Sequence, residues 1–399
     1  MAKKSSLRHR LYHGETSFDF MGHKRWWFAI SGVIIAAGVI SLITAGLNLG
    51  IDFKGGVSWT VKAKGVSVAS MRDTVRPFGL GEATIQTTGN DSIKVSAKHL
   101  SEEKQNQITD AIAKTAHTTA QQVNVNDVGP SWGKAVTNKA RTALIVFFIL
   151  ITVYISFRFE WKMAVAAIIA VIHDILITVG VYSISRFEVT PATVVAFLTI
   201  LGYSLYDTIV VFDRIEENTR GLSSSGRMTY SDTVNLSMNQ VLMRSLNTSF
   251  VAILPVASVL FIGVYFLGAT ALEDFALALL VGLITGAYSS IFIASPVLVM
   301  LKEREPRYAA IRQRLATKGG AVGAPLTPAA AAVMAGGGGI GAAGGRVVRS
   351  GDGGGDGDGE AAVSEGGPPL VPGRPRTVPA HRPHGRQGGR PRPRKKRRR

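Results

Sequence analysis

The stretch LGYSLYDTIVVFDRIEEN, residues 201–218, begins as an apolar run suited to the interior of a membrane and ends as charged chain suited to water. Asp207 lies on the apolar side of that change, ahead of the run Ile209–Phe212. An ionised carboxylate in hydrocarbon costs about 2.5–3.5 kcal/mol on insertion scales, so an acid inside a membrane helix indicates a function or a dedicated partner. The stretch therefore predicts a membrane span built around a buried acid.

The rest of the chain has the same blocked distribution of apolar residues. Of its 399 residues, 46% are hydrophobic. A hydrocarbon core about 30 Å thick needs about 20 helical residues to cross it. Six stretches meet this requirement: residues 26–47, 143–157 with their flanks, 163–183, 191–212, 246–266 and 276–301. The sequence thus predicts a polytopic α-helical membrane protein with six transmembrane helices.

The first stretch and the composition exclude several other classes. Basic residues precede residues 26–47, as in a secretory signal, but the apolar run is longer than the usual length of about 7–15 residues, and we interpret it as a retained span. The chain has no cysteine, which excludes disulfides, thiol catalysis and cysteine-based metal sites. No phosphate loop, metal-ligand spacing or nucleophile triad occurs. The sequence therefore predicts no enzyme, no cofactor and no metal.

Residues 48–138, between the first two spans, have the pattern of a small α+β domain. Four strands are predicted at 57–61, 83–88, 92–97 and 123–128, and two helices at 67–76 and 101–116. Ser101 precedes the second helix, and Glu102 and Glu103 lie in its first turn, where acids favour the helix dipole. The order βαββαβ predicts a ferredoxin-like unit.

The Lys and Arg residues of the short loops predict the orientation. The N-terminal segment 1–25, the loop 158–162, the loop after the fourth span and the segment 302–318 are basic, and all fall on one side if the spans alternate. Loops on the other side carry Arg186 as their one base, or only acids. Both termini are therefore expected in the cytoplasm, and the α+β domain on the external side of the membrane, with residues 139–305 holding the remaining five spans.

Residues 306–399 are predicted to form a disordered cytoplasmic tail rich in Gly, Pro and Arg. Such a composition cannot bury enough apolar surface to offset the entropy of ordering. Twelve Lys or Arg and no acid occur in the last thirty residues, and they supply two thirds of the formal net charge of +18. No aromatic residue interleaves with them, so base stacking is not indicated. We predict weak nonspecific attraction to anions and no specific nucleic-acid partner.

Three charged side chains in or beside the spans are candidates for proton transfer. Asp207 lies in the fourth span, Asp174 near the middle of the third, and Arg244 at the entry to the fifth. A desolvated carboxyl favours its neutral form and a nearby guanidinium reverses that preference, so the set is suited to take up and release protons. In the structural alternative, Asp207 pairs with Arg244 or a backbone group and Asp174 pairs with Thr178. We interpret His173 as structural.

Two further features of the spans indicate helix packing. Small residues recur every four positions in the sixth span, at Gly282, Gly286, Ser290 and Ala294. Such a stripe lets another helix approach closely, and we interpret Ser290 as part of it because no base partner is in sight. Proline at positions 255 and 296 is predicted to kink the fifth and sixth spans.

Several short motifs, taken together, resemble those of the SecF family, the smaller membrane subunit of the bacterial SecD–SecF protein-export complex. The resemblance covers about residues 20–305. It rests on LGIDFKGG at 49–56, VGPS at 128–131, FRFEW at 157–161, the pair His173-Asp174, GYSLYDT at 202–208, DRI at 213–215, Arg244, and AYSS at 287–290.

This resemblance implies a half-unit of the resistance-nodulation-division (RND) architecture in a bacterial plasma membrane, with SecD as the second six-span half. It implies a proton-driven role beside the SecYEG channel, in which external domains grip the emerging preprotein. Asp207 and Arg244 fall where the family carries residues implicated in proton transport, and Asp174 lies in a shared motif. The family commonly has Asn in place of Tyr206 and Arg in place of Glu216, and the bulkier Tyr206 is expected to alter the geometry near Asp207.

Two other functions are compatible with these residues. One is a small-molecule or lipid exporter of the same architecture, which is disfavoured because the external segment of about ninety residues is smaller than a substrate-porter assembly usually needs. The other is a passive scaffold that holds translocon subunits together, in which the three charged residues would be dispensable.

Overall fold

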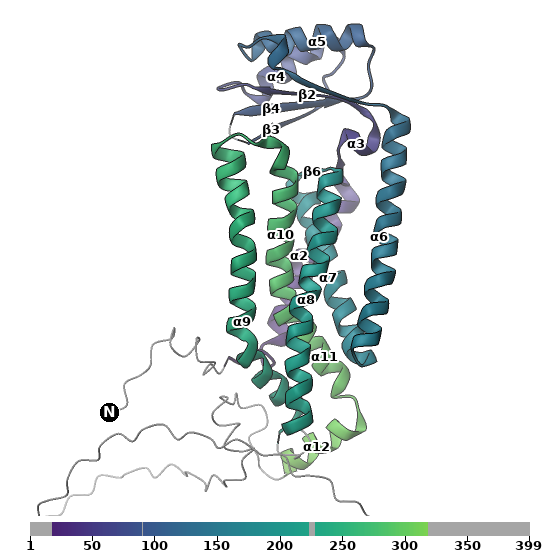
Figure 1. Cartoon of the computed structure of the whole chain (residues 1–399), viewed down its shortest axis with the longest axis vertical. Coiled ribbons are helices and arrows are strands. Elements are labelled where there is room, and N and C mark those ends of the chain that lie inside the picture. Colours follow the sequence, from purple (N-terminus) through teal and green to yellow (C-terminus); the bar gives the residue numbers. More distant parts are fainter. Residues whose placement is uncertain (1–17, 90, 223–227, 318–399) are drawn as a thin grey trace, which may run out of the picture. The chain divides into compact units, whose positions relative to one another are not determined.

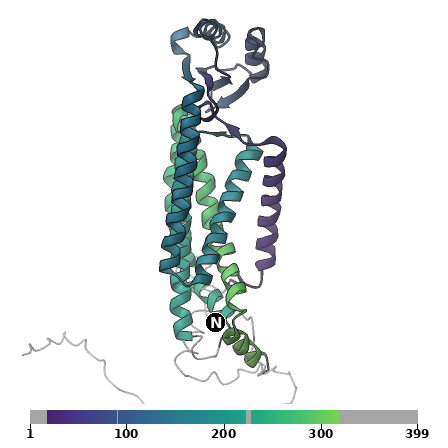
Figure 2. The same ribbon diagram turned by 90° about the vertical axis from the view of Figure 1, so that its right-hand side faces the viewer.

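Six helical segments long and apolar enough to cross a membrane form the body of the protein, as the sequence predicts (Figures 1 and 2). The structure is a computed structural model that describes residues 18–89, 91–222 and 228–317. The segments are α2 (Lys24–Ala45); α6 (Pro130–Arg158); α7 (Trp161–Ser185); α8 (Pro191–Leu222); α9 (Tyr230–Ser258) continued by the π-helix η4 (Val259–Phe266); and a sixth made of η5 (Thr270–Leu272), α10 (Glu273–Ser289), the π-helix η6 (Ser290–Ala294) and α11 (Ser295–Lys302).

Several of these helices continue past their apolar runs. Helix α6 begins at Pro130, within the residues that the sequence assigns to the α+β domain. Proline suits the first position of a helix, and the first turns of α6 pack on the short helix α3 (Ile51–Lys54): a Cβ on Gly133 would lie 2.9 Å from the carbonyl oxygen of Phe53. Hydropathy marks the part of a helix that lies in lipid, so it does not show polar turns such as these.

The α+β domain has the predicted βαββαβ order, and every strand and helix ends within one residue of the prediction. Its elements are β2 (Gly56–Lys62), α4 (Val68–Val75), the 3₁₀ turn η1 (Arg76–Phe78), β3 (Thr84–Thr88), β4 (Ser92–Ala97), α5 (Glu102–Thr115), the 3₁₀ turn η2 (Ala120–Gln122) and β5 (Asn124–Val128). The sheet order is β3-β4-β2-β5, and all neighbouring strands are antiparallel. This is the ferredoxin-like arrangement.

The domain has a hydrophobic core of its own between the sheet and its two helices. Trp59 of β2 is fully buried, and its indole N–H donates to Thr109 Oγ1 of α5 at 3.0 Å. Met71 of α4 and Ile108 and Ile112 of α5 are also fully buried. Burial of a large apolar side chain such as these stabilises the folded state by about 1.5–3 kcal/mol. The apolar faces of α4 and α5 are therefore held against the sheet.

Short contacts join this domain to one end of the helical bundle, called here the domain end. β1 (Asn48–Leu49) pairs in parallel with β6 (Glu188–Val189), which lies between α7 and α8. Lys94 of β4 reaches Glu188, with Nζ and Oε2 2.8 Å apart. The sequence does not reveal this contact, because two-residue strands carry no alternating pattern.

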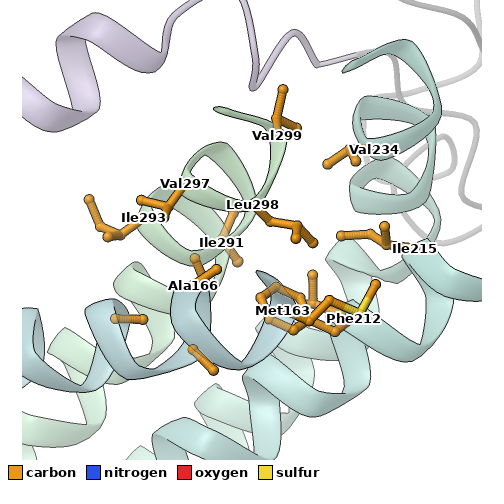
Figure 3. Close-up of a cluster of buried hydrophobic side chains, with 14 of the residues drawn as sticks. Met163, Ala166, Phe212, Ile215, Val234, Ile291, Ile293, Val297, Leu298 and Val299 are labelled. Carbon is orange, nitrogen blue, oxygen red and sulfur yellow. The ribbon is translucent and has the colours of Figure 1, made fainter. Parts of the chain in front are cut away.

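The opposite end of the bundle, called here the α12 end, contains the largest hydrophobic cluster (Figure 3). The figure labels residues of α7, α8, α9, η6 and α11: Met163, Ala166, Phe212, Ile215, Val234, Ile291, Ile293, Val297, Leu298 and Val299. All of them are buried. The cluster includes side chains from η6, from α8 and from the helices α7 and α9 on either side of α8 in the chain. This packing fixes the π-helical segment against α8.

The start of the predicted tail is ordered, contrary to the sequence prediction. Residues 306–317, assigned to the disordered segment 306–399, form helix α12 (Pro306–Thr317). Tyr308 is buried with its ring centroid 4.8 Å from that of Tyr230, and Lys162 pairs with Glu305 at 2.9 Å. These contacts hold a segment whose composition alone does not predict a packed helix. Residues 318–399 and 1–17 lie outside the described residues.

Candidate functional site

Asp207 lies where three helical segments meet. Its carboxylate belongs to α8 and is 3% exposed. One oxygen accepts a hydrogen bond from Ser245 Oγ of α9 at 2.7 Å, and the other accepts one from Ser290 Oγ of η6. The acid is thus satisfied by two hydroxyl donors from two neighbouring helices, as a buried polar group requires.

The π-helix η6 begins at Ser290, where the sixth span passes Asp207. π-Helical turns are rare, and short ones inside α-helices occur frequently at functional sites. The two preceding small residues of the stripe pack on α8 as predicted: a Cβ on Gly282 would lie 2.2 Å from Ile200 Cδ1, and one on Gly286 would lie 2.8 Å from Ser204 Cβ. The same register carries Ser290 to Asp207, so the stripe is both a packing surface and part of the site.

Asp174 of α7 is the second buried acid, 1% exposed. One oxygen accepts a hydrogen bond from Ser204 Oγ of α8 at 2.5 Å, and the other lies 3.1 Å from Nδ1 of His173. The predicted alternative partner, Thr178, is buried as well, but the hydrogen bond goes to Ser204. Ser204 lies one turn before Asp207 on α8, so a single turn of α8 carries both Asp207 and the serine that donates to Asp174.

Arg244 does not pair with Asp207. Its side chain is exposed, and its backbone carbonyl accepts a hydrogen bond from Thr248 Oγ1 at 2.6 Å. No ion pair of Arg244 occurs within the part of the chain that the structure describes. The neighbouring Ser245 is the residue of α9 that reaches Asp207. The structure therefore gives each of the two predicted acids a serine hydroxyl as a partner, with His173 also beside Asp174, and it does not pair Arg244 with either acid.

Tyr206 lies outside the site. It is 53% exposed, although it precedes Asp207 in the chain, because adjacent residues of a helix point in directions about 100° apart. The expected crowding of Asp207 by this larger side chain does not occur in the described structure. Ser245 and Ser290 are the site residues that the sequence analysis missed or interpreted as packing, and the small-residue stripe was the signal for Ser290.

Comparison with known proteins places these features in a family. Residues 107–304 match the family described as protein export membrane protein SecD/SecF, C-terminal, and residues 40–64 match the SecD/SecF GG motif. Protein translocase subunit SecF of Streptomyces coelicolor is 44% identical over 319 residues, which cover 80% of this chain and 86% of that protein. The chain belongs to the SecF family. SecF of Rhodothermus marinus is 37% identical over 311 residues, which cover 75% of this chain and 97% of that protein.

The SecF-family fold also appears in a solved structure. The crystal structure of SecDF, a translocon-associated membrane protein from Thermus thermophilus, matches this chain with a TM-score of 0.66 and 36% identity. The match covers 73% of this chain and 39% of the SecDF chain. The architecture is therefore that of an RND-like half-unit, as the resemblance implied.

The GG motif of this SecF-family chain has a structural explanation. Gly55 has φ +77° and Gly56 has φ +140°. Residues that carry a side chain rarely adopt these backbone conformations. A Cβ on Gly56 would lie 2.3 Å from the carbonyl oxygen of Ala97, and one on Gly55 would lie 2.9 Å from Pro130 Cα. The two glycines thus let β2 leave α3 while lying directly against β4 and the start of α6.

Proposed function

We propose that this chain is an accessory subunit of the Sec protein translocase that works with SecD and uses the proton motive force to promote late-stage preprotein export. Family membership supports the export role. The match to 39% of the single SecDF chain supports a partner, because the remainder of SecDF has no counterpart in the matched part of this chain. In this proposal the second six-span half is SecD, and the pair acts beside SecYEG on unfolded preprotein.

The observation that carries the proposal is the hydroxyl-only environment of Asp207. A serine hydroxyl donates to a carboxylate and can rotate to accept from a carboxylic acid. Both protonation states of Asp207 can therefore be hydrogen-bonded, but with different arrangements of Ser245 and Ser290. Since these serines belong to α9 and η6, protonation changes the contacts that hold three helices together.

The energy available is sufficient for such a change. One charge that moves through 100 mV releases about 2.3 kcal/mol, which is larger than the net contribution of about 0.5–1.5 kcal/mol from a typical hydrogen bond. The proposed sites of proton transfer are Asp207, Asp174 and Arg244. Arg244 would act beside the Asp207 site and not as its ion-pair partner, because its side chain is exposed.

The proposed orientation follows the loop charges, with both termini in the cytoplasm of a bacterial cell and the α+β domain outside the plasma membrane. The domain end of the bundle is then the external end, and the α12 end is cytoplasmic. Movement of helices at Asp207 would reach the α+β domain through the β1–β6 pairing and the Lys94–Glu188 ion pair. No covalent chemistry on a substrate is part of the proposal.

The test uses vesicles that contain the chain with SecD and SecYEG and follows the completion of preprotein export under an imposed proton gradient. Asp207→Asn should preserve co-isolation with SecD and abolish the gradient-dependent part of export. Asp213→Asn is the matched control, because Asp213 lies on the same helix but is an exposed partner of Arg158 at 2.6 Å.

Two results would contradict the proposal. Unchanged gradient-dependent export by Asp207→Asn would remove its central residue, and full secretion by a variant with Asp174, Asp207 and Arg244 all replaced would favour a passive scaffold. Normal secretion in cells that lack the chain, together with accumulation of a drug or lipid, would favour an exporter.

A further inference from the structure

An unbroken series of polar contacts leads away from Asp174 toward the α12 end of the bundle. Nδ1 of His173 lies 3.1 Å from the Asp174 carboxylate, and Nε2 of the same ring lies 3.0 Å from Ser31 Oγ of α2. Ser31 Oγ lies 3.1 Å from the hydroxyl of Tyr288 on α10. The Tyr288 hydroxyl donates to the carbonyl oxygen of Trp27 at 3.1 Å. Trp27 is one helical turn from Lys24, where α2 begins.

Packing holds these groups in line inside the bundle. His173 and Ser31 are buried, and Tyr288 is half-buried. The imidazole stacks on the Tyr288 ring, with centroids 6.0 Å apart and 28° between the planes. Helices α2 and α7 come unusually close at Gly38 and Gly180, where a Cβ on Gly38 would lie 2.6 Å from Gly180 Cα. This approach brings Ser31 within reach of His173.

We infer that His173, Ser31 and Tyr288 form a proton wire that connects Asp174 with water at the α12 end. Each of the three side chains has both a donor and an acceptor function, which is what a relay requires. The titratable groups in line are Asp174 and His173 of α7 and Tyr288 of α10, while α2 contributes a hydroxyl. The inference rests on the proposed function and adds three residues to it, with His173 changed from a structural to a proton-carrying role.

The transfer balances as follows. With Asp174 protonated, the donors all point one way: the carboxyl O–H to Nδ1, the Nε2–H to Ser31, the Ser31 O–H to Tyr288, and the Tyr288 O–H to the Trp27 carbonyl. The Asp174 proton moves to Nδ1 and leaves an imidazolium beside a carboxylate. Nε2 then releases its proton to Ser31 as Ser31 passes its own to Tyr288. The Tyr288 O–H turns from the Trp27 carbonyl to a water molecule at the α12 end and passes its proton to that water.

One O–H bond is therefore broken at Asp174 and one is formed on water, while each hydroxyl regains the proton it gives up. No oxidant or other reactant is needed. The donors of the wire are left pointing in the opposite direction, so the side chains must reorient before the next transfer, and the wire carries one proton at a time.

The experiment measures proton flux in vesicles that contain the full chain with SecD. Tyr288→Phe removes the hydroxyl and keeps the stacked ring, and His173→Gln keeps a hydrogen-bonding side chain that cannot become an imidazolium. Each should lower the flux about 100-fold, the lower end of what a positioned proton-transfer group contributes. The ratio of flux in H₂O to flux in D₂O should also differ between each variant and the wild type, because the protons that still cross in the variant take a different route.

Matched controls separate the wire from general damage to packing. Ser41→Ala removes another hydroxyl contact between α2 and α7, the 2.9 Å contact with Ser183, and Tyr182→Phe removes another phenol that donates to a backbone carbonyl in the bundle. Both should keep wild-type flux.

The outcomes distinguish the wire from the proposed function. Wild-type flux in Tyr288→Phe and His173→Gln, with loss of gradient-dependent export in Asp207→Asn, would overturn the wire and leave the proposed function intact. A lower flux with an unchanged isotope ratio would indicate fewer folded complexes and would also overturn the wire. Gradient-dependent export that survives Asp207→Asn, together with a flux that falls in Tyr288→Phe, would support the wire and contradict the proposed role of Asp207.

Discussion

Asp207 and Asp174 are two acids buried to the same degree in one bundle, yet their partners differ in kind. Asp207 accepts hydrogen bonds from Ser245 and Ser290, two hydroxyls on two other helices. Asp174 accepts one from Ser204 and lies against the imidazole of His173, which continues into a series of further polar groups. A single turn of α8 separates the two environments.

This difference indicates a division of work between the two acids. The hydroxyls of Ser245 and Ser290 can reorient when the charge of Asp207 changes, but they do not take up its proton. Protonation of Asp207 is therefore expected to change the contacts between helices. An imidazole can accept a proton at one ring nitrogen and release one from the other, so a proton on Asp174 can move on. We therefore expect Asp207 to couple protonation to movement and Asp174 to serve mainly as a conduit.

The largest expected effect separates the two acids directly. Asp207→Asn should abolish both gradient-driven export and its coupling to proton flux, whereas Asp174→Asn should lower the flux about 100-fold and leave the slower export still dependent on the gradient. The measurement is export per unit of proton flux in vesicles. Equal loss of both quantities in the two variants would show that the acids act as one unit and would end the proposed division.

Removal of one serine from the Asp207 site should have an intermediate effect. Ser290→Ala or Ser245→Ala takes away one donor to a buried carboxylate, a loss of about 1–3 kcal/mol, and should lower gradient-driven export by about tenfold or more. Ser289→Ala is the control for Ser290→Ala, because Ser289 is equally buried and donates only to Gly286 in the described structure, at 3.3 Å. A loss of the same size in Ser289→Ala would assign the effect to packing.

Substitutions in the packing between α8 and α10 should have a smaller effect than those at the buried acids and their serines. A Cβ on Gly286 would lie 2.8 Å from Ser204 Cβ, so Gly286→Ala should reduce stability by about 1–3 kcal/mol through overpacking and should disturb the contact between Ser204 and Asp174. Gly202→Ala on α8 has nothing within 4 Å of the added Cβ and should be neutral or slightly stabilising. Thermal unfolding in detergent measures both, and equal unfolding temperatures would contradict the close packing.

The smallest expected effect lies in the α+β domain. Burial raises the pKa of the Asp127 carboxyl, but hydrogen bonds from Gln105 and His99 and the charge of His99 lower it more, so the pKa lies below its usual 3.8. Because the folded pKa is below the unfolded one, this contribution to stability is present above about pH 4 and is lost as the pH falls through the folded pKa.

Asp127→Asn should therefore flatten the acid dependence of hydrogen exchange in β5, measured on the full chain. Asp110→Asn, at an exposed acid of α5, should leave that dependence as it is in the wild type. The same acid dependence in wild type and Asp127→Asn would contradict the assignment.

Much of the fold could be predicted because its signals are local. Apolar runs located all six spans, and local signals such as Ser101 and the first-turn acids Glu102 and Glu103 helped to place the elements of the domain within one residue. Features without a local pattern could not be predicted. These are the two-residue pairing of β1 with β6, the π-helical turns, and helix α12, which is held on the bundle by the contact of Tyr308 with Tyr230.

Only the two acids of the candidate site could be predicted from the sequence. An acid in an apolar run is conspicuous, so Asp207 and Asp174 could be found, but serine is common in membrane helices and gives no signal of its own. In the structural alternative, the sequence offered Arg244 or a backbone group as the partner of Asp207. In the structure, the side chain that reaches Asp207 belongs to the next residue, Ser245, because one residue turns the direction of a helical side chain by about 100°.

The central claim is that Asp207 gains and loses a proton in the working protein. Infrared difference spectra of the full chain with SecD, recorded across a pH titration and compared with Asp207→Asn, test it most directly. A carboxylic-acid carbonyl band that is absent from the variant and that converts to a carboxylate band as the pH rises is the predicted result. A carboxylate band of Asp207 that stays constant at every pH at which the complex is folded would contradict the account.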